Sequence, residues 1–260
     1  MAPWPAGTGR EVHAELDSTN AEALRRLAAG APGPLWLMAR RQSAARGRRG
    51  RPWATAEGNF AATLMLRPEA PPAALALRSF AAALALHDAL VAATGRAELF
   101  ALKWPNDVLL GGAKLAGILL ETGGSPPGLA IGFGVNLAAA PETEALEPGA
   151  LAPVSLRGAT GTAPDPEAFL DLLAPPMAAW EARLEAEGFA PLRAAWLARA
   201  ARLGAPVTAR LPGRVVEGRF ETVDATGALV LATAAGRVAL PAAEVHFDTR
   251  AEEAGHAAGH

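Results

Sequence analysis

Six consecutive positions of the chain, Arg46 to Arg51, hold four arginines and two glycines within the stretch QSAARGRRGRPW at residues 42–53. Arginine offers a planar fork of N–H donors that matches phosphate or carboxylate oxygens two at a time, and glycine lets the backbone approach a ligand. The pattern therefore predicts a mobile loop that binds an anion. Taken alone, the twelve residues fit a solvated basic surface loop or an arginine-rich nucleic-acid arm more simply.

Lysine is rare in this chain, which holds 22 arginines but only two lysines. We infer a GC-rich genome in which arginine has replaced lysine wherever the position allows it. A compact ammonium charge and a wide guanidinium fork are not interchangeable in a tight site, so the remaining lysines should mark functional positions. The scarce lysines, asparagines and glutamine all fall in unusual motifs: Asn20, Gln42, Asn59, Lys103, Asn106, Lys114 and Asn136.

Four polar residues in a row, Asp17-Ser18-Thr19-Asn20, precede the helical stretch AEALRRLAA. Asp17 or Ser18 can cap the helix by accepting a free N–H group of its first turn. Capping explains Asp17 best and the other three residues less well. We therefore expect Ser18 and Thr19 to present their hydroxyl groups at the mouth of the helix.

The second informative region is residues 99–121, LFALKWPNDVLLGGAKLAGILLE. It predicts a strand, a turn over residues 105–107 and then a hairpin joined at Gly111-Gly112. Lys114 begins the last strand, which is otherwise nearly all apolar. A buried ammonium group without a partner is costly, so Lys114 requires an acid of the protein or an anionic ligand, unless it lies on the hairpin surface.

Residues 129–137, LAIGFGVNL, predict a strand with apolar side chains on one face and Gly132 and Gly134 on the other. Glycine at alternate positions lets another group press flat against the strand backbone. We expect that group to be either a neighbouring strand or an apolar ligand.

Strands over residues 11–16, 35–40 and 59–66 surround the first two motifs, so the basic loop connects two strands as a lid would. A long helix over residues 71–95 follows them.

Further along the chain, helices are predicted over residues 166–187, with a break at Pro175-Pro176, and over residues 189–202. After Gly204 short strands alternate with turn signals, which predicts a small β-barrel.

The composition excludes several classes of protein. The net charge is −2 and the pI is near 6.2, which disfavours a protein that mainly coats nucleic acid. The chain has no cysteine, so disulfides and thiolate sites are excluded. Every apolar run of membrane-spanning length contains Arg, Pro or Gly, and the N-terminus lacks the apolar core of a signal peptide. We expect a cytoplasmic protein without a membrane partner.

In combination, the motifs resemble the biotin protein ligases, which activate biotin with ATP and transfer it to a lysine of a biotin carboxyl carrier protein. Five motifs occur in the order of that family: DSTN at 17–20, Q-x-A-x-RGRRGR-x-W at 42–53, KWPND at 103–107, KLAGILLE at 114–121 and G-x-G-x-N at 132–136. The resemblance implies an α+β fold with a mixed or antiparallel sheet and packed helices, followed by an SH3-like barrel. We expect a catalytic domain over residues 1–203, the barrel over 204–248 and a disordered tail over 249–260.

The resemblance also implies a role for each site residue. Contacts with the biotin ring or the wall of its pocket would come from Ser18, Thr19, Gln42 and the backbone of Gly117. The biotin carboxylate and the ATP phosphates would be held, and catalysis assisted, by Arg46, Arg48 and Lys114. The nucleotide side would comprise Arg49, Arg51, Trp53, Lys103, Asn106, Asp107 and Asn136. Mg²⁺ would accompany ATP without assigned protein ligands.

This chain departs from the family pattern at two positions. Ala45 stands where the basic loop commonly begins with glycine, which would stiffen the loop, and Ala243 precedes Glu244 where glycine is common. Some members carry an N-terminal DNA-binding helix-turn-helix. Because the DSTN motif begins at residue 17, we expect no such domain, no DNA binding, and a monomer or weak homodimer.

Two alternatives remain open. A lipoate or octanoate ligase or transferase shares the fold implied by the resemblance, although the RGRRGR loop favours biotin. A non-catalytic nucleic-acid-binding module would use the same arginines, but it predicts aromatic side chains interleaved with them. Trp53 is the only aromatic residue of the loop.

Overall fold

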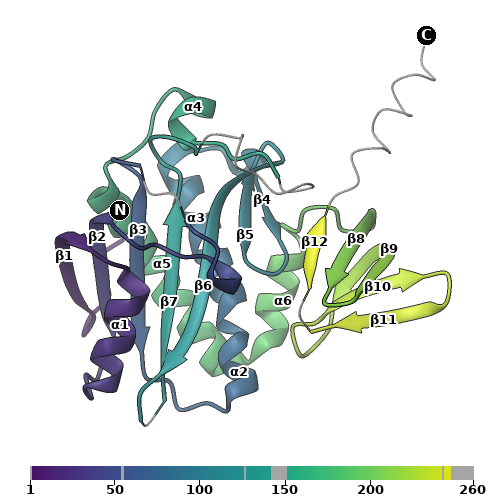
Figure 1. Cartoon of the computed structure of the whole chain (residues 1–260), viewed down its shortest axis with the longest axis horizontal. Helices are drawn as coiled ribbons and strands as arrows, with labels where there is room; N and C mark the ends of the chain where they lie inside the picture. The colour runs from purple at the N-terminus through teal and green to yellow at the C-terminus, as the bar shows by residue number, and fades with distance from the viewer. Residues whose placement is uncertain (1, 54–55, 126, 142–150, 242, 247–260) are drawn as a thin grey trace.

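The structure is a computed structural model that describes residues 2–53, 56–125, 127–141, 151–241 and 243–246. A large sheet covered by helices forms the main body, and a smaller sheet follows at the C-terminal end (Figure 1). The elements in chain order are β1 (Gly9–Leu16), α1 (Thr19–Ala28), β2 (Leu35–Gln42), the 3-10 turn η1 (Arg48–Gly50), β3 (Phe60–Leu66), α2 (Pro72–Ala76), α3 (Arg78–Thr94), the 3-10 turn η2 (Ala97–Leu99), β4 (Phe100–Lys103), β5 (Asp107–Leu110), β6 (Ala113–Gly123), β7 (Gly128–Val135), α4 (Leu156–Thr160), α5 (Pro166–Glu187), α6 (Phe189–Leu197), β8 (Pro206–Leu211), β9 (Arg214–Val223), β10 (Leu229–Thr233), β11 (Gly236–Leu240) and β12 (Glu244–His246).

The main sheet has seven strands in the order β1-β2-β3-β7-β6-β5-β4. Strands β1 and β2 are parallel, and α1 provides the crossover connection that parallel strands require. Every other neighbouring pair of this sheet is antiparallel. The predicted α+β fold with a mixed sheet is therefore confirmed.

The two faces of the main sheet are covered differently. On one face α3 and α5 pack against the strands and form the core, in which Leu84, Leu86 and Phe169 are fully buried. The segment Ala73–Thr94 is long and apolar enough to span a membrane, but 67% of its most apolar window is buried inside the protein. On the opposite face α1 packs over β2, β3 and β7 through Ala23 and Leu27. The rest of this face lies beneath the basic loop.

Three helices differ from their predicted form. The helix predicted over residues 189–202 is shorter, since α6 ends at Leu197. The helix predicted over residues 71–95 is divided at Leu77 into α2 and α3, and Gly95 ends it in the left-handed conformation with φ 71°. The break predicted at Pro175-Pro176 is wrong, because α5 continues through both prolines. Buried residues on both sides of the prolines hold α5 in place, and such tertiary packing outweighs the hydrogen bonds that proline removes.

The C-terminal sheet has five strands in the order β11-β10-β9-β8-β12, and its core is continuous with that of the main body. Phe220 of β9 lies 6.4 Å from Trp196 of α6, measured between ring centroids. The indole N–H of Trp104 donates to the carbonyl of Gly227 at 3.1 Å. These contacts fix the barrel beside the β4–β5 turn. The tail predicted over residues 249–260 lies outside the described residues.

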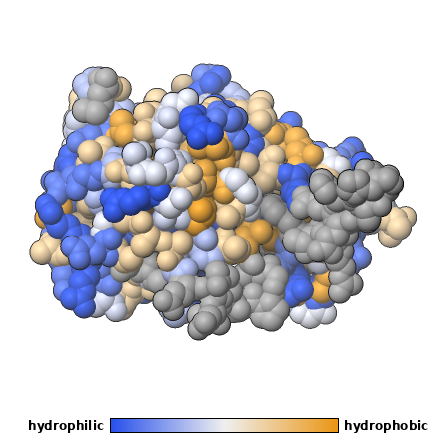
Figure 2. All heavy atoms as spheres, turned by 90° about the horizontal axis from the view of Figure 1, so that it is seen from above, coloured by the Kyte–Doolittle hydropathy of each residue, from blue (hydrophilic) through white to orange (hydrophobic). Residues whose placement is uncertain are grey.

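Hydrophilic side chains gather at the end of the molecule that carries β1 and α1, whereas apolar side chains form a strip near the middle of the upper face (Figure 2).

Candidate active site

The basic loop forms a short hairpin between β2 and β3. The backbone N–H of Gly47 donates to the carbonyl of Arg51 at 2.7 Å, and that of Trp53 donates to Ala45 at 3.0 Å. At the tip, Arg49 has a positive φ of 59°. Ala45 is not among the residues with positive φ, so alanine fits this position without backbone strain. The stiffening that we expect from Ala45 stays a prediction.

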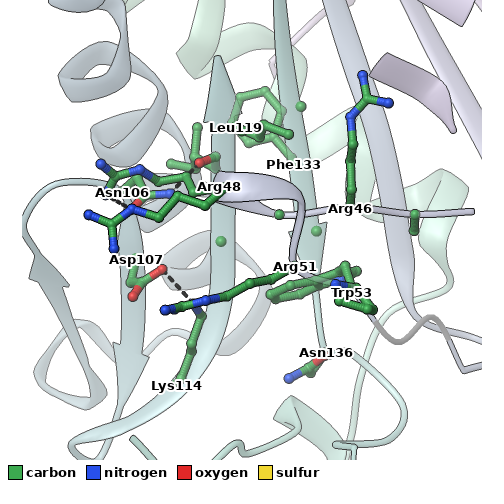
Figure 3. A pocket seen from close by; sticks show the side chains of 18 of the residues that line it. Arg46, Arg48, Arg51, Trp53, Asn106, Asp107, Lys114, Leu119, Phe133 and Asn136 are labelled. Atoms are coloured by element: carbon green, nitrogen blue, oxygen red, sulfur yellow. Dashed lines mark hydrogen bonds and ion pairs between the residues drawn. The ribbon is translucent and has the colours of Figure 1, made fainter. Parts of the chain in front are cut away.

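A cavity of about 600 Å³ lies between this loop and the open face of the main sheet (Figure 3). A volume of this size suits a small-molecule ligand. Its walls come from the start of α1, the loop, β4 to β7 and β12. All the predicted site residues line it: Ser18, Thr19, Gln42, Arg46, Arg48, Arg49, Arg51, Trp53, Lys103, Asn106, Asp107, Lys114, Gly117 and Asn136.

The start of α1 contributes a polar corner to the cavity. Ser18 is the N-cap, because its Oγ accepts the backbone N–H of Ala21 at 3.4 Å. The prediction that Asp17 caps the helix is wrong. The Asp17 side chain instead accepts the N–H of Ser18 at 2.7 Å and pairs with Arg25 outside the cavity. Hydrogen bonds from Arg25 lower the pKa of the Asp17 carboxyl to about 2.

Thr19 and Gln42 meet in this corner, as the sequence predicts for two residues of one pocket. The Oε1 of Gln42 accepts the backbone N–H of Thr19 at 2.7 Å. Because its carbonyl end is engaged, the Gln42 amide presents its NH₂ group as a donor. The Thr63 hydroxyl lies 2.8 Å from Oγ1 of Thr19 and holds that side chain from β3.

Asn20 belongs to the DSTN motif, but the sequence assigned it no role. It is 4% exposed, and its Nδ2 donates to the carbonyl of Leu119 at 3.2 Å and to Oε2 of Glu121 at 2.9 Å. Its Oδ1 accepts from the Thr63 hydroxyl at 2.6 Å. A Cβ at position 132 would collide with the Asn20 side chain, so Gly132 is needed to make room for it.

Trp53 occupies the other part of the glycine face. A Cβ added to Gly134 would lie 2.7 Å from the Trp53 indole, and one added to Gly117 would lie 3.3 Å from it. We expected a strand or an apolar ligand against these glycines. The structure corrects this expectation: two side chains of the protein, Trp53 and Asn20, press on the strand backbone, because the loop and α1 fold over it.

The only two lysines of the chain converge on one carboxylate. Lys114 Nζ lies 2.8 Å from Oδ1 of Asp107, and Lys103 Nζ lies 3.6 Å from Oδ2. Lys103 and Asp107 are paired across the β4–β5 hairpin and are less than a tenth exposed, whereas the Lys114 side chain is 32% exposed. The sequence predicts an acid of the protein or an anionic ligand as the partner of Lys114, and in the structure that partner is Asp107. The ammonium group of Lys114 also faces the cavity.

The loop arginines point to different parts of the site (Figure 3). Arg48 donates to Oδ1 of Asn106 at 3.5 Å, close to the lysine pair. Arg46 turns away and donates to Oε1 of Glu121 at 3.1 Å. Arg46 and Lys114 line the same cavity but pair with different carboxylates of the protein, and the expectation that both hold the carboxylate of one ligand stays a prediction. Arg51 extends from the loop toward Lys114.

Some residues reach the site from distant segments and could not be assigned to it from the sequence. Val245 and His246 of β12 line the cavity, so the barrel forms part of its wall. Glu121 contacts Arg46 behind the cavity. In the sequence, only its position at the end of the KLAGILLE motif could have indicated that Glu121 belongs to the site.

Comparisons with known proteins identify the family of the chain. Residues 14–136 match the Biotin/lipoate A/B protein ligase family, and residues 203–248 match the biotin protein ligase C terminal domain. A biotin--[acetyl-CoA-carboxylase] ligase of Paracoccus denitrificans is 59% identical over 237 residues, covering 90% of this chain and 98% of that protein. The ligase of the same name from Mycobacterium tuberculosis is 37% identical over 251 residues, covering 92% and 90%.

A solved structure shows the same fold. The biotin protein ligase from Aquifex aeolicus, in complex with biotin and ATP, superposes with a TM-score of 0.77 at 24% identity, covering 91% of this chain and 97% of that chain. Because two regions match in order and a relative is 59% identical over nearly its whole length, this chain belongs to the biotin protein ligases.

Proposed function

We propose that the protein activates biotin with ATP to biotinyl-5′-AMP and transfers the biotinyl group to a lysine of a biotin carboxyl carrier protein. One observation carries this proposal: the two lysines of the chain meet Asp107 at one end of a cavity whose other end is a hydrogen-bonding corner. Such a cavity suits an elongated acid with a polar ring at one end and a carboxylate at the other.

The biotin ring suits the corner formed by α1 and Gln42. The NH₂ group of Gln42 and the hydroxyls of Ser18 and Thr19 offer donors and acceptors to a cyclic urea. Leu119, on the same face of β6 as Gly117, gives the cavity an apolar surface on which the rest of the ligand can lie.

The nucleotide suits the opposite end. The Oδ1 of Asn136 is buried, lines the cavity and has no hydrogen-bond partner within the described part of the chain. A buried acceptor of this kind requires a donor, and the amino group of adenine is one. Arg48, Arg49 and Arg51 also line the cavity, and their guanidinium groups match phosphate oxygens.

In the first step, a carboxylate oxygen of biotin attacks the α-phosphorus of ATP. An acyl–phosphate bond forms, the bond to the β-phosphate breaks, and pyrophosphate leaves with the bonding electrons. Both reactants are anions, so fixed cations at Lys114 and Arg48 lower their repulsion and stabilise the charge that develops in the transition state. Because Asp107 holds Lys114 in place, the ammonium group is oriented before the substrates bind.

In the second step, the lysine amine of the carrier attacks the acyl carbon, an amide forms, and AMP leaves. The loop that covers the cavity keeps water from the mixed anhydride until the carrier arrives. We propose that the carrier belongs to acetyl-CoA carboxylase, as the names of the relatives indicate.

Magnesium commonly accompanies ATP, but the described residues do not offer a protein-made site for it. They contain no group of three potential acidic, histidine or cysteine ligands. Asp107 is the one acid among the cavity-lining residues, and both its oxygens face lysines. We therefore propose that the ion is coordinated by the phosphates of the nucleotide.

The test of the first step is biotin-dependent exchange of labelled pyrophosphate into ATP. The test of the second is biotinylation of a purified carrier domain of acetyl-CoA carboxylase, read by avidin blot. We expect both signals to require biotin and ATP together. A folded protein that gives neither would exclude the proposed activity.

Lipoate or octanoate transfer is the second candidate, since the matching family includes lipoate ligases. The C-terminal match to biotin protein ligases favours biotin. Competition between biotin and octanoate for one enzyme, read on one carrier domain, separates the two. The nucleic-acid module is disfavoured because the arginines of the loop line a cavity of a size that suits a small molecule. We further propose a cytoplasmic monomer or weak homodimer that does not bind DNA, which gel filtration and filter binding can test.

A further inference from the structure

Glu121 joins three segments of the chain through one carboxylate. Its Oε1 accepts from Nη2 of Arg46 in the loop at 3.1 Å, and its Oε2 accepts from Nδ2 of Asn20 in α1 at 2.9 Å. Glu121 itself lies on β6, opposite Ala130 of β7. It does not line the cavity, so its contacts act on the site through other residues.

Asn20 gives this carboxylate a rigid support. The amide is buried and is held by a backbone carbonyl of β6, by the Thr63 hydroxyl and by Glu121 itself. The Asn20 amide occupies the space that a Cβ at position 132 would take, since that Cβ would collide with Oδ1. One oxygen of Glu121 is therefore fixed, and the other is directed at Arg46.

The contacts form a path that begins and ends on the same segment. It runs from Gln42 to Thr19, Thr63, Asn20, Glu121 and Arg46, with successive polar atoms 2.6 to 3.2 Å apart. Residues 42 and 46 are the two ends of the segment that starts the loop. The path therefore binds the start of the loop to α1, β3 and β6, and it passes beneath the corner that suits the biotin ring.

From these contacts we infer that Glu121 is a positioning residue of the biotin site: through Arg46 it holds the first arm of the loop closed over biotin and its adenylate. The inference rests on the proposed function. The part of the loop after Gly47 is held separately, by the hydrogen bond from Arg48 to Asn106. Asp107 forms its ion pairs with Lys103 and Lys114, so loss of Glu121 should release the loop and leave these two ion pairs in place.

Limited trypsin digestion of the full chain tests the loop directly, because trypsin cleaves after the loop arginines. In Glu121→Gln the amide still accepts from Asn20 but has no charge for Arg46. We expect cleavage within residues 46–49 to accelerate about threefold to fivefold, as fits a partly exposed ion pair. Glu221→Gln is the matched control, since Glu221 also pairs with an arginine and is 27% exposed against 26% for Glu121. Equal loop cleavage in both variants would overturn the inference.

Kinetics then separate positioning from chemistry. In biotin-dependent pyrophosphate exchange, Glu121→Gln should raise KM for biotin about threefold to fivefold and leave kcat within a factor of about two. The preformed adenylate, labelled in biotin, should also leave the enzyme faster by a similar factor. A fall in kcat at unchanged KM would contradict the inference. If the wild type shows no exchange, the proposed function fails while the digestion result still tests the loop contact.

The Arg46→Gln variant approaches the same pair from the loop and does not alter the sheet. If the two residues act through one contact, cleavage after Arg48 and Arg49, which all variants retain, should be no faster in the double variant than in either single variant. If the increases in cleavage rate caused by Arg46→Gln and Glu121→Gln instead multiply in the double variant, the two residues act separately. That result would overturn the inference. This comparison also holds if Glu121→Gln lowers the stability of the fold.

Discussion

At the residue scale, the site depends on which charges are paired before any substrate binds. Lys114 and Lys103 share Asp107, while Arg46 is taken by Glu121. The cations thus have two different roles. The two lysines face the part of the cavity proposed for the carboxylate and the phosphates, and the guanidinium group of Arg46 holds the loop. A lysine that is already oriented loses less side-chain freedom when the substrate arrives.

Replacing Lys114 by alanine tests its part in the chemistry. Removal of one preorganised charge at the developing transition state should lower kcat for adenylate formation about 10²–10³-fold. The fold should persist, because Lys103 remains beside Asp107. Pyrophosphate exchange measures the rate and thermal unfolding measures the fold. An unaltered exchange rate would remove Lys114 from the mechanism, and the avidin blot would then show whether transfer is affected instead.

Gly132→Ala tests the close approach of Asn20 to β7. The added methyl group would meet the Asn20 side chain, and overpacking at such a site costs about 1–3 kcal/mol of unfolding free energy. Urea unfolding measures this cost. In an Asn20→Ala background the obstacle is absent, so the same substitution should cost clearly less. Equal costs in the two backgrounds would show that Asn20 does not require this glycine.

At the element scale, α3 and α5 are joined by a buried ion pair on the face remote from the site. Arg78 of α3 is 3% exposed and lies 2.6 Å from the carboxylate of Glu181 of α5. Burial raises the pKa of the Glu181 carboxyl even though Arg78 opposes this shift. The pair therefore holds the two helices together only while both partners are present.

Arg78→Met should destabilise the protein by about 3–5 kcal/mol at neutral pH, because it leaves the Glu181 carboxylate buried without its cation. An acid whose folded-state pKa is raised loses its penalty when protonated, so the destabilisation should shrink as the pH falls toward 4. Urea unfolding at pH 7 and pH 4 measures both effects. Arg96→Met, at an exposed pair with Glu98, is the control and should change little. A loss that is the same at both pH values would contradict this account.

The positions of the elements could be largely predicted from sequence, because hydrophobic period and turn residues are local signals. Strand β6 and the β4–β5 turn lie within a few residues of their predicted places. The course of α5 could not be predicted, since local preference for a break at Pro175-Pro176 is overruled by packing against α3, which only the folded chain supplies.

Several site residues could also be located from local signals in the sequence. The side chains with which they form hydrogen bonds and ion pairs could not. Lys114 and Gln42 stand out because their residue types are scarce in this chain. Glu121 lies 75 residues from Arg46 and 101 residues from Asn20. These contacts arise when the loop, α1 and β6 meet in space, and no spacing in the sequence encodes them.

At the scale of the whole molecule, the barrel and the main body build one site. Val245 and His246 line the cavity from β12, while Trp104, next to Lys103, donates to Gly227 of the barrel. Trp196 of the main body and Phe220 of the C-terminal sheet belong to one continuous hydrophobic core, which holds the two parts together. Because part of the cavity wall comes from β12, the stability of the C-terminal sheet should affect the shape of the cavity.

The acid stability of the whole protein should reflect the charge pairs around α1. Hydrogen bonds from Arg26 lower the pKa of the Glu11 and Glu22 carboxyls, and those from Arg25 lower the pKa of Asp17 to about 2. When a folded-state pKa is depressed, the unfolded chain takes up protons first as the pH falls. The stability from these pairs is therefore present above about pH 4.5 and is lost progressively toward pH 2.

Thermal unfolding of the wild type and of Asp17→Asn between pH 7 and pH 2.5 tests this dependence. The variant lacks the carboxyl with the strongly depressed pKa, so its unfolding temperature should fall less steeply below about pH 4. Asp17 is 46% exposed on its side chain, and surface pairs are screened by salt. The difference in slope should accordingly narrow in about 1 M NaCl. Parallel curves at low salt would show that the Asp17–Arg25 pair does not contribute to acid stability, whereas a difference that salt leaves unchanged would assign the effect to the hydrogen bond with Ser18.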